Sequence, residues 1–258
     1  MKISAVISGM NEKQNEIITS GLIGISAYMC ADISHEVIGH GGVAMISGNH
    51  IDLLTSVFFK STPGGIITDL AGPLSNLFFG LLIFAILKLK SNKSFLFTLW
   101  LTTVMAYNFF WFSGTILQSG FSKTGDWIYT ISQLNIGTTA TFLLIISGII
   151  AFLISFKFVA NGFSDLKQGF SKISLKQSTI YAYLFAILAA NAAGLFYVPD
   201  RISASKEGLL EMLASLPILF VGQKASETQI TVETDWIFYF SIFTSYILFC
   251  LTLGKGIY

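Results

Sequence analysis

Six apolar stretches, each long enough to cross a lipid bilayer, dominate this 258-residue chain. A helix needs roughly 20 mainly apolar residues to span the hydrocarbon core of a bilayer. Only 11% of the residues are charged, whereas an ordinary soluble domain has about 25%. A chain with so few charges cannot cover a water-exposed surface, so lipid must be its solvent. The stretches lie at about residues 17–45, 70–87, 95–117, 138–156, 179–198 and 236–253.

These stretches predict an all-α polytopic membrane protein of about six transmembrane helices, with a short β-hairpin-like insertion after the first. The insertion is expected within residues 48–65, where strand-forming residues end in a Pro-Gly-Gly turn. A long segment, residues 200–235, separates the last two stretches. Its leucines, at positions 209–216, predict a short amphipathic helix at the membrane interface.

Lysine and arginine residues are distributed unevenly between the loops. With six spans, ten of them fall on the side of the N-terminus and five on the opposite side. A Lys/Arg excess marks the cytoplasmic side, so we expect a multi-pass protein of the cytoplasmic membrane with both termini cytoplasmic. The net charge of +1 gives no reason to expect nucleic acid as a partner.

Ionisable residues occur at the end of the first apolar stretch, in the motif His35-Glu36-x-x-x-His40. Each ionisable group inside a bilayer costs on the order of 2.5 kcal/mol or more unless it is paired. A divalent cation would compensate, because imidazole nitrogens suit zinc and a neighbouring glutamate can take a proton from zinc-bound water. The motif therefore predicts Zn²⁺ held by His35 and His40, with Glu36 as the general base.

The spacing of the two histidines differs from the usual zinc-protease motif, H-E-x-x-H. Histidines four apart lie about 40° apart around an α-helix, whereas histidines five apart lie about 140° apart. A π-bulge can absorb the extra residue, and Gly39 is where the helix would deform most easily. Asp32 lies four residues before Glu36 and would share its polar face as an outer neighbour of the site or a proton relay.

A catalytic zinc site needs a third protein ligand and an open position for water. Asp126 is the first choice, because its glycine-containing loop, residues 120–127, returns to the membrane side where the first stretch ends. We predict an Asp126 carboxylate oxygen within about 2.0–2.2 Å of the zinc. His50 and Asp69 are reserves, and Asp200 is a further candidate on that side. Helix capping for Asp126, and capping or loop hydrogen bonding for His50 and Asp69, are the structural alternatives.

Three features together resemble a known family. They are the histidine motif, the strand-like stretch at about 50–62, and Asp69-Leu70-Ala71-Gly72-Pro73-Leu74-Ser75-Asn76. The chain resembles the site-2 protease (M50) family of intramembrane zinc metalloproteases, whose second span opens with a similar Ala-Gly-Pro-Leu-Ala-Asn segment. The likeness covers roughly residues 20–127. It implies a metalloprotease-like core at about 17–135 and additional spans at 136–258, within a single transmembrane domain over residues 1–258.

The chain departs from that family in three respects. It has H-E-x-x-x-H in place of H-E-x-x-H, although a zinc peptidase family of another kind, dipeptidyl peptidase III, also uses five-residue spacing. The family's Leu-Asp-Gly motif is absent, and Asn108 and Asp126 are its nearest counterparts. Asn76 and Asn108 are further candidates for neighbours of the site. No PDZ-like insertion is present.

The sequence thus predicts a membrane-embedded zinc metalloprotease that hydrolyses peptide bonds of membrane-associated substrates, with Glu36 activating a zinc-bound water. Its expected partners are membrane lipid and a membrane-protein or peptide substrate, and the site should face the side opposite the cytoplasm. The alternative is a non-proteolytic membrane protein, either a transporter-type proton relay or a metal-dependent hydrolase of small or lipid substrates. The same residues could also form a hydrogen-bonded cluster that only packs the spans together.

Overall fold

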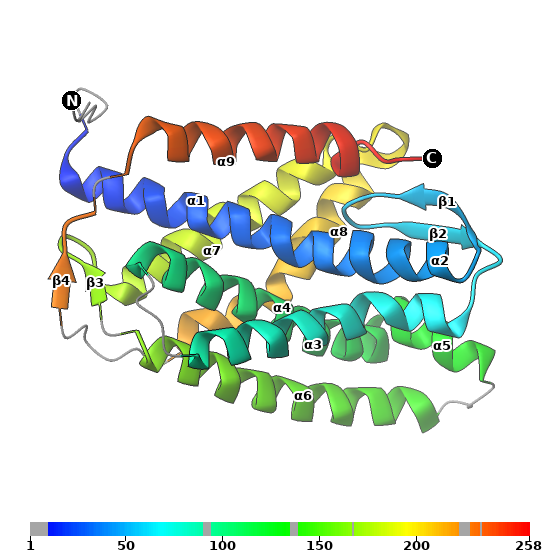
Figure 1. The fold of residues 1–258 in the computed structure, drawn as a ribbon. Helices are drawn as coiled ribbons and strands as arrows, with labels where there is room; N and C mark the ends of the chain where they lie inside the picture. Colours follow the sequence, from blue (N-terminus) through cyan, green and yellow to red (C-terminus); the bar gives the residue numbers. More distant parts are fainter. Residues whose placement is uncertain (1–9, 90–93, 135–138, 167, 222–227, 233) are drawn as a thin grey trace.

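The computed structural model describes residues 10–89, 94–134, 139–166, 168–221, 228–232 and 234–258. Long helices run side by side along one axis, and short strand pairs lie at both ends of the bundle (Figure 1). The predicted all-α polytopic fold is therefore confirmed. The α-helices of the described residues are α1 (Glu12–Asp32), α2 (Gly42–Ile46), α3 (Ile66–Lys88), α4 (Phe95–Ser122), α5 (Asp126–Gln133), α6 (Thr139–Ser164), α7 (Leu175–Gly194), α8 (Arg201–Ala214) and α9 (Trp236–Phe249).

Shorter elements complete the described part of the chain. Two segments are π-helices and two are 3₁₀-helices. The π-helices are η1 (Ile33–Gly41) and η4 (Cys250–Gly254), and the 3₁₀-helices are η2 (Val198–Asp200) and η3 (Leu216–Phe220). Four short strands form two pairs, β1 with β2 antiparallel and β3 with β4 parallel. They are β1 (His50–Leu54), β2 (Phe59–Thr62), β3 (Gln168–Phe170) and β4 (Thr228–Ile230).

Five helical segments among the described residues are long and apolar enough to cross a membrane. The first is continuous through α1, η1 and α2, and a sixth arises if α7 and the segment Val198–Phe220 count as one span bent by 90°. The other four are α3, α4, α6 and the joined α9–η4. α6 and α9 leave many large apolar side chains exposed, as lipid-facing helices do, so the predicted number of about six spans agrees with the structure.

The short helix expected at the membrane interface is α8, and it packs within the helix bundle. It packs against α7 and α4, and its Met212 side chain is fully buried. Gly208 allows this close approach, because a Cβ there would lie 2.6 Å from the carbonyl oxygen of Ala190 in α7. The helix therefore belongs to the bundle and carries the chain back along it (Figure 1).

The return of the chain through α8 also changes the expected position of the C-terminus. Ile257 pairs with Leu54 of β1, at the end of the bundle opposite the start of α1 (Figure 1). We expected both termini on one side of the membrane. The structure places the start of α1 and the C-terminus at opposite ends of the bundle, because α8 runs back along it (Figure 1).

The hairpin predicted after the first span is present. β1 and β2 pair from His50 opposite Thr62 to Leu54 opposite Phe59, with an irregularity between Ile51 and Leu53. The hairpin follows the C-terminal end of the first span and contacts η1. It therefore covers the end of the bundle where the sequence places the histidine motif.

The opposite end of the first span is anchored by a buried acid. Asn11 and Gln14 form a capping box that starts α1. Glu16, in the first turns, is 1% exposed and accepts hydrogen bonds from the loop after β3. Its carboxylate receives the backbone N–H groups of Ser171, Lys172 and Ile173 and the Ser171 hydroxyl, at 2.8 to 3.0 Å.

Candidate metal centre

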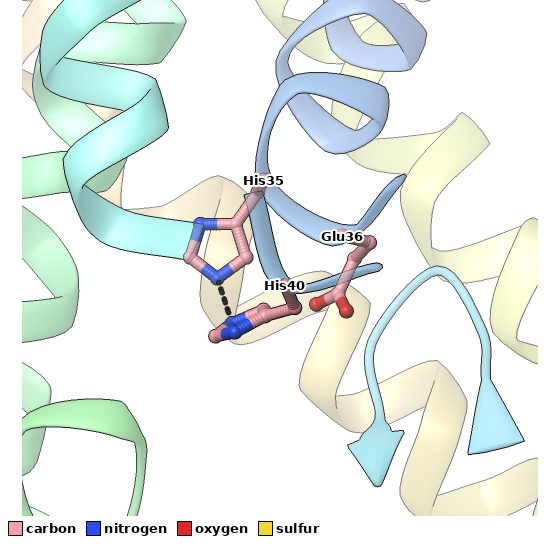
Figure 2. A group of neighbouring side chains, drawn as sticks. All are labelled: His35, Glu36 and His40. Carbon is pink, nitrogen blue, oxygen red and sulfur yellow. Dashed lines mark hydrogen bonds between the residues drawn. The ribbon is translucent and has the colours of Figure 1, made fainter. Parts of the chain in front are cut away.

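The two histidines of the motif come together because the first span becomes a π-helix at η1. Backbone hydrogen bonds of a π-helix join residues five apart, so His35 and His40 share one face. Their Nε2 atoms lie 3.3 Å apart (Figure 2). The bulge proposed to absorb the extra residue is therefore present, and it extends over nine residues.

Two glycines allow the histidine face to approach α3. A Cβ at Gly39 would lie 2.7 Å from the carbonyl oxygen of Ala71 and from the Cα atom of Gly72. A Cβ at Gly72 would overlap the Nε2 atom of His40 and lie 2.7 Å from that of His35. The absence of a side chain at Gly72 thus lets α3 contact both imidazoles directly, at a position where one methyl group would overlap them.

Asp126 faces the two histidines from α5. Its carboxylate oxygens lie 3.3 Å from His35 Nε2 and 3.5 Å from His40 Nε2. The chain reaches this position through Lys123, in the left-handed region, and Gly125, whose φ of 95° favours glycine. Gly125 is the N-cap of α5, so Asp126 is not the capping residue that the structural alternative required.

The electrostatic environment keeps the Asp126 carboxylate charged. Burial alone would raise the pKa of this carboxyl, but the adjacent His40 and His35 side chains hold its pKa well below the usual range. An anionic oxygen therefore faces both Nε2 atoms at neutral pH.

An asparagine chain fixes the tautomer of His35. Asn108 Nδ2 donates to the carbonyl oxygen of Val104 at 2.9 Å, and Asn108 Oδ1 accepts from Asn76 Nδ2 at 2.9 Å. Asn76 Nδ2 also donates to the carbonyl oxygen of Ala31, which leaves Asn76 Oδ1 facing His35 Nδ1 at 2.6 Å. An oxygen can only accept, so His35 carries its hydrogen on Nδ1 and, when neutral, a lone pair on Nε2.

The backbone of α3 fixes the tautomer of His40 in the same way. His40 Nδ1 lies 2.7 Å from the carbonyl oxygen of Thr68 and must donate to it. Its Nε2 atom then carries a lone pair in the neutral ring. On the other side the ring stacks on Phe59 of β2, with centroids 5.1 Å apart. Both rings are therefore held with their Nε2 atoms toward Asp126.

The two Nε2 atoms and the Asp126 carboxylate thus converge on one point. Two neutral Nε2 atoms and a carboxylate repel one another unless a proton or a cation lies among them. Hydrogen bonds from metal-binding histidines to carbonyl or carboxamide oxygens are typical of zinc sites. Two imidazoles and one carboxylate form a donor set that catalytic zinc sites use. The residues therefore fit a zinc ion.

Glu36 lies beside this donor set in the same π-helix. One ligand atom from each of His35, Glu36 and His40 lies within 4.8 Å of the others, and Figure 2 shows the Glu36 carboxylate on the same side as the His40 ring. Glu36 is 5% exposed, and among the described residues its Oε2 atom has no hydrogen-bond partner. A carboxylate so placed can accept a proton from a water molecule that enters the site.

The other predicted residues occupy different positions. Asp32 is fully buried and lies beside the Tyr28 hydroxyl. Asp69 borders the site and accepts a hydrogen bond from Gln133 at 2.7 Å.

His50 pairs with Asp52 at 3.1 Å on the surface of the hairpin. Asp200 caps α8 through the N–H of Ser203. The structure therefore brings neither His50 nor Asp200 to the site.

A cavity of about 380 Å³ opens at the candidate metal centre. Glu207 and Glu211 of α8 line it together with the histidines, Glu36 and Asp126. The sequence interpretation missed these two acids, because α8 was expected outside the bundle. The sequence did indicate that the two acids share one face of a helix, because they lie four residues apart in a leucine-rich segment.

Comparisons with protein-family models, with curated proteins and with solved structures give no significant match.

Proposed function

We propose that this chain is a membrane-embedded zinc metalloprotease with a core like that of the site-2 protease family. The observation that carries the proposal is the convergence of two oriented Nε2 atoms and one carboxylate, at 3.3 to 3.5 Å. The glutamate next to the first histidine and the Gly-Pro opening of α3 agree with the residues that carry the family resemblance. His35, His40 and Asp126 would hold the zinc ion.

The residues around the donor set have distinct roles in this proposal. A bound zinc ion would supply Lewis acidity toward water and toward the scissile carbonyl. Glu36 accepts the proton of the attacking water and passes it to the leaving amine, as a general base and then a general acid. Asn76 and Thr68 orient the two imidazoles through their Nδ1 hydrogens. The cavity admits water and a peptide segment at membrane depth.

Metal analysis of the detergent-purified protein tests the zinc site. We expect close to one equivalent of zinc in the wild type, and its loss in Gly72→Ala, whose added methyl group would overlap His40 Nε2. Gly65→Ala is the matched control, because a Cβ at Gly65, just before α3, meets nothing within 4 Å. Zinc absent from the wild type, or fully retained in Gly72→Ala, would contradict the proposal.

Peptide cleavage by protein reconstituted in lipid tests the reaction itself. We expect a chelator to stop cleavage and added zinc to restore it. Cleavage that resists complete zinc removal would exclude the metalloprotease mechanism. Zinc binding without cleavage of any peptide, but with hydrolysis of ester or lipid amide bonds, would favour the metal-dependent hydrolase instead.

A transporter-type proton relay is the second candidate, and Asp32 favours it. A fully buried carboxylate near another acid, as Asp32 is near Glu36, is a common feature of proton pathways in membranes. The 90° bend between α7 and the segment that follows also resembles the broken helices of transporters. Uptake or efflux that Asp32→Asn abolishes, and that needs no zinc, would reverse our ranking.

A further inference from the structure

The cavity at the metal centre is lined by acids far more than by bases. Five carboxylate residues line it, and none of its described lining residues is lysine or arginine. The acids are Glu36, Asp69, Asp126, Glu207 and Glu211.

The two acids of α8 are held toward the cavity by the packing of their helix. Glu207 and Glu211 lie four residues apart and therefore share one face of α8. Ala204 and Gly208 pack against α7, where their neighbours are Gly194 and the carbonyl group of Ala190. This packing fixes the rotation of α8 about its axis. The acids cannot turn to the outside of the bundle without separating the two helices.

Unpaired oxygens indicate that the cavity receives a ligand. Glu211 Oε2 is buried and has no hydrogen-bond partner among the described residues. The same is true of Glu36 Oε2, whose residue is 5% exposed and also lines the cavity. Buried carboxylate oxygens without donors are unfavourable, and two carboxylates four residues apart on a helix repel each other. A group that brings positive charge and several N–H donors would relieve both.

We propose that Glu207 and Glu211 bind a cationic side chain, arginine or lysine, of the peptide substrate close to the scissile bond. This inference rests on the proposed protease function and adds a substrate class to it. Guanidinium and ammonium groups supply the missing donors. Trp111 and Tyr129, which also line the cavity, provide aromatic faces that favour a cation.

Two fluorescent peptides test this assignment. They are apolar decapeptides that differ only at one central residue, arginine in one and its neutral isostere citrulline in the other. Binding is measured by fluorescence anisotropy on the full chain carrying Glu36→Gln, so that the probes are not cleaved. We expect the arginine peptide to bind at least about tenfold more tightly, and this ratio to fall as salt is added.

Substitutions on α8 locate the effect. Glu211→Gln and Glu207→Gln, each in the same background, should reduce the ratio to about threefold or less while leaving affinity for the citrulline peptide unchanged. That unchanged affinity shows that the variant is folded. Glu12→Gln is the matched control, because it removes one negative charge at the far end of α1, where Glu12 pairs with Lys172.

The outcomes separate this inference from the proposed function. Equal affinity for the two peptides, binding of neither, or an unchanged ratio in both α8 variants would overturn the cationic-side-chain site. A chain that holds zinc and cleaves peptides can still give those results, and then only this inference fails. If a chain without zinc bound the arginine peptide selectively, the cationic-side-chain site would stand and the proposed protease function would fail.

Discussion

Each end of the first span buries a carboxylate, and the two carboxylates differ in their hydrogen-bond partners. Glu16, near the start of α1, accepts four hydrogen bonds from the loop after β3. Glu36, in the π-helix, leaves Oε2 without a partner among the described residues. The two side chains are almost equally buried, at 1% and 5% exposure.

This difference separates an acid that holds the fold together from an acid that serves a site. A buried carboxylate surrounded by backbone N–H groups is already satisfied, so its removal should damage the structure. A buried carboxylate without donors destabilises the fold, and such groups are typical of functional sites. Both acids lie in apolar helical sequence and look alike there, so the comparison depends on their partners.

The largest expected effect is that of Glu36→Gln on catalysis. Loss of the general base should lower the rate of peptide cleavage on the order of 10²- to 10⁴-fold. Zinc content should not change, because Glu36 is not one of the proposed ligands, and the apparent melting temperature should stay the same or rise. Rate assays and metal analysis on one preparation check this.

Full activity in Glu36→Gln would remove the proposed mechanism. Loss of zinc together with activity would instead make Glu36 a ligand, which its distance from both histidines permits.

The next effect is that of Glu16→Ala on stability. Three backbone N–H groups would lose their acceptor in a partly buried loop, and each unsatisfied group that is buried costs about 1–3 kcal/mol. We expect a clear fall in the apparent melting temperature in detergent, with zinc content per folded molecule unchanged. A Glu16→Ala protein as stable as the wild type would show that hydrogen-bond partners do not distinguish the two acids.

A smaller effect is expected for Asn76→Ala, which frees the ring of His35. Loss of a partner that orients a metal ligand usually lowers metal affinity by about 10- to 100-fold. Competition with a chelator of known affinity measures this change. Asn161→Ala, an exposed asparagine of α6, is the control. Equal zinc affinity in both variants would mean that the asparagine chain only packs α3 against α4.

The smallest effect is expected for Glu12→Gln, which breaks an exposed ion pair with Lys172 of 2.9 Å. Exposed pairs contribute little to stability, so we expect no measurable change in melting temperature at neutral pH. The hydrogen bond and charge of Glu12 raise the pKa of Lys172. Any stabilisation is therefore present below the ordinary lysine pKa and is lost as pH rises through the raised value. A marked difference between variant and wild type near pH 7 would contradict this.

The sequence predicted the fold well where lipid imposes strict rules on composition. Long apolar runs identified α3, α4, α6 and α9, because a span without enough apolar residues cannot remain in a bilayer. The Pro-Gly-Gly turn located the hairpin. The convergence of Asp126 with the histidines was also predicted, because glycines in its loop and its side of the membrane limited the possible positions. Whether these residues bind zinc stays a prediction.

The sequence could not predict features that depend on contacts between distant segments. α8 carries Glu207 and Glu211 and so resembles a helix at the membrane surface, whereas its Gly208 side packs deep against α7. The position of the C-terminus, at the end of the bundle opposite the start of α1, depends on the same helix. The role of Gly72 was not predictable either, because its close contact with the two histidines exists only once η1 and α3 are packed.

The π-helix has a consequence for how such sites can change over evolutionary time. One residue added to an α-helix turns everything after it by about 100°, which would ordinarily destroy a site built on two turns. Here the widened helix confines that rotation to η1, and the chain continues as α-helix at α2. Val37 and Ile38 lie between the histidines, and Ile38 is 48% exposed. Deletion of one of them would restore four-residue spacing and a regular helix, so one codon gained or lost connects the two forms of the motif.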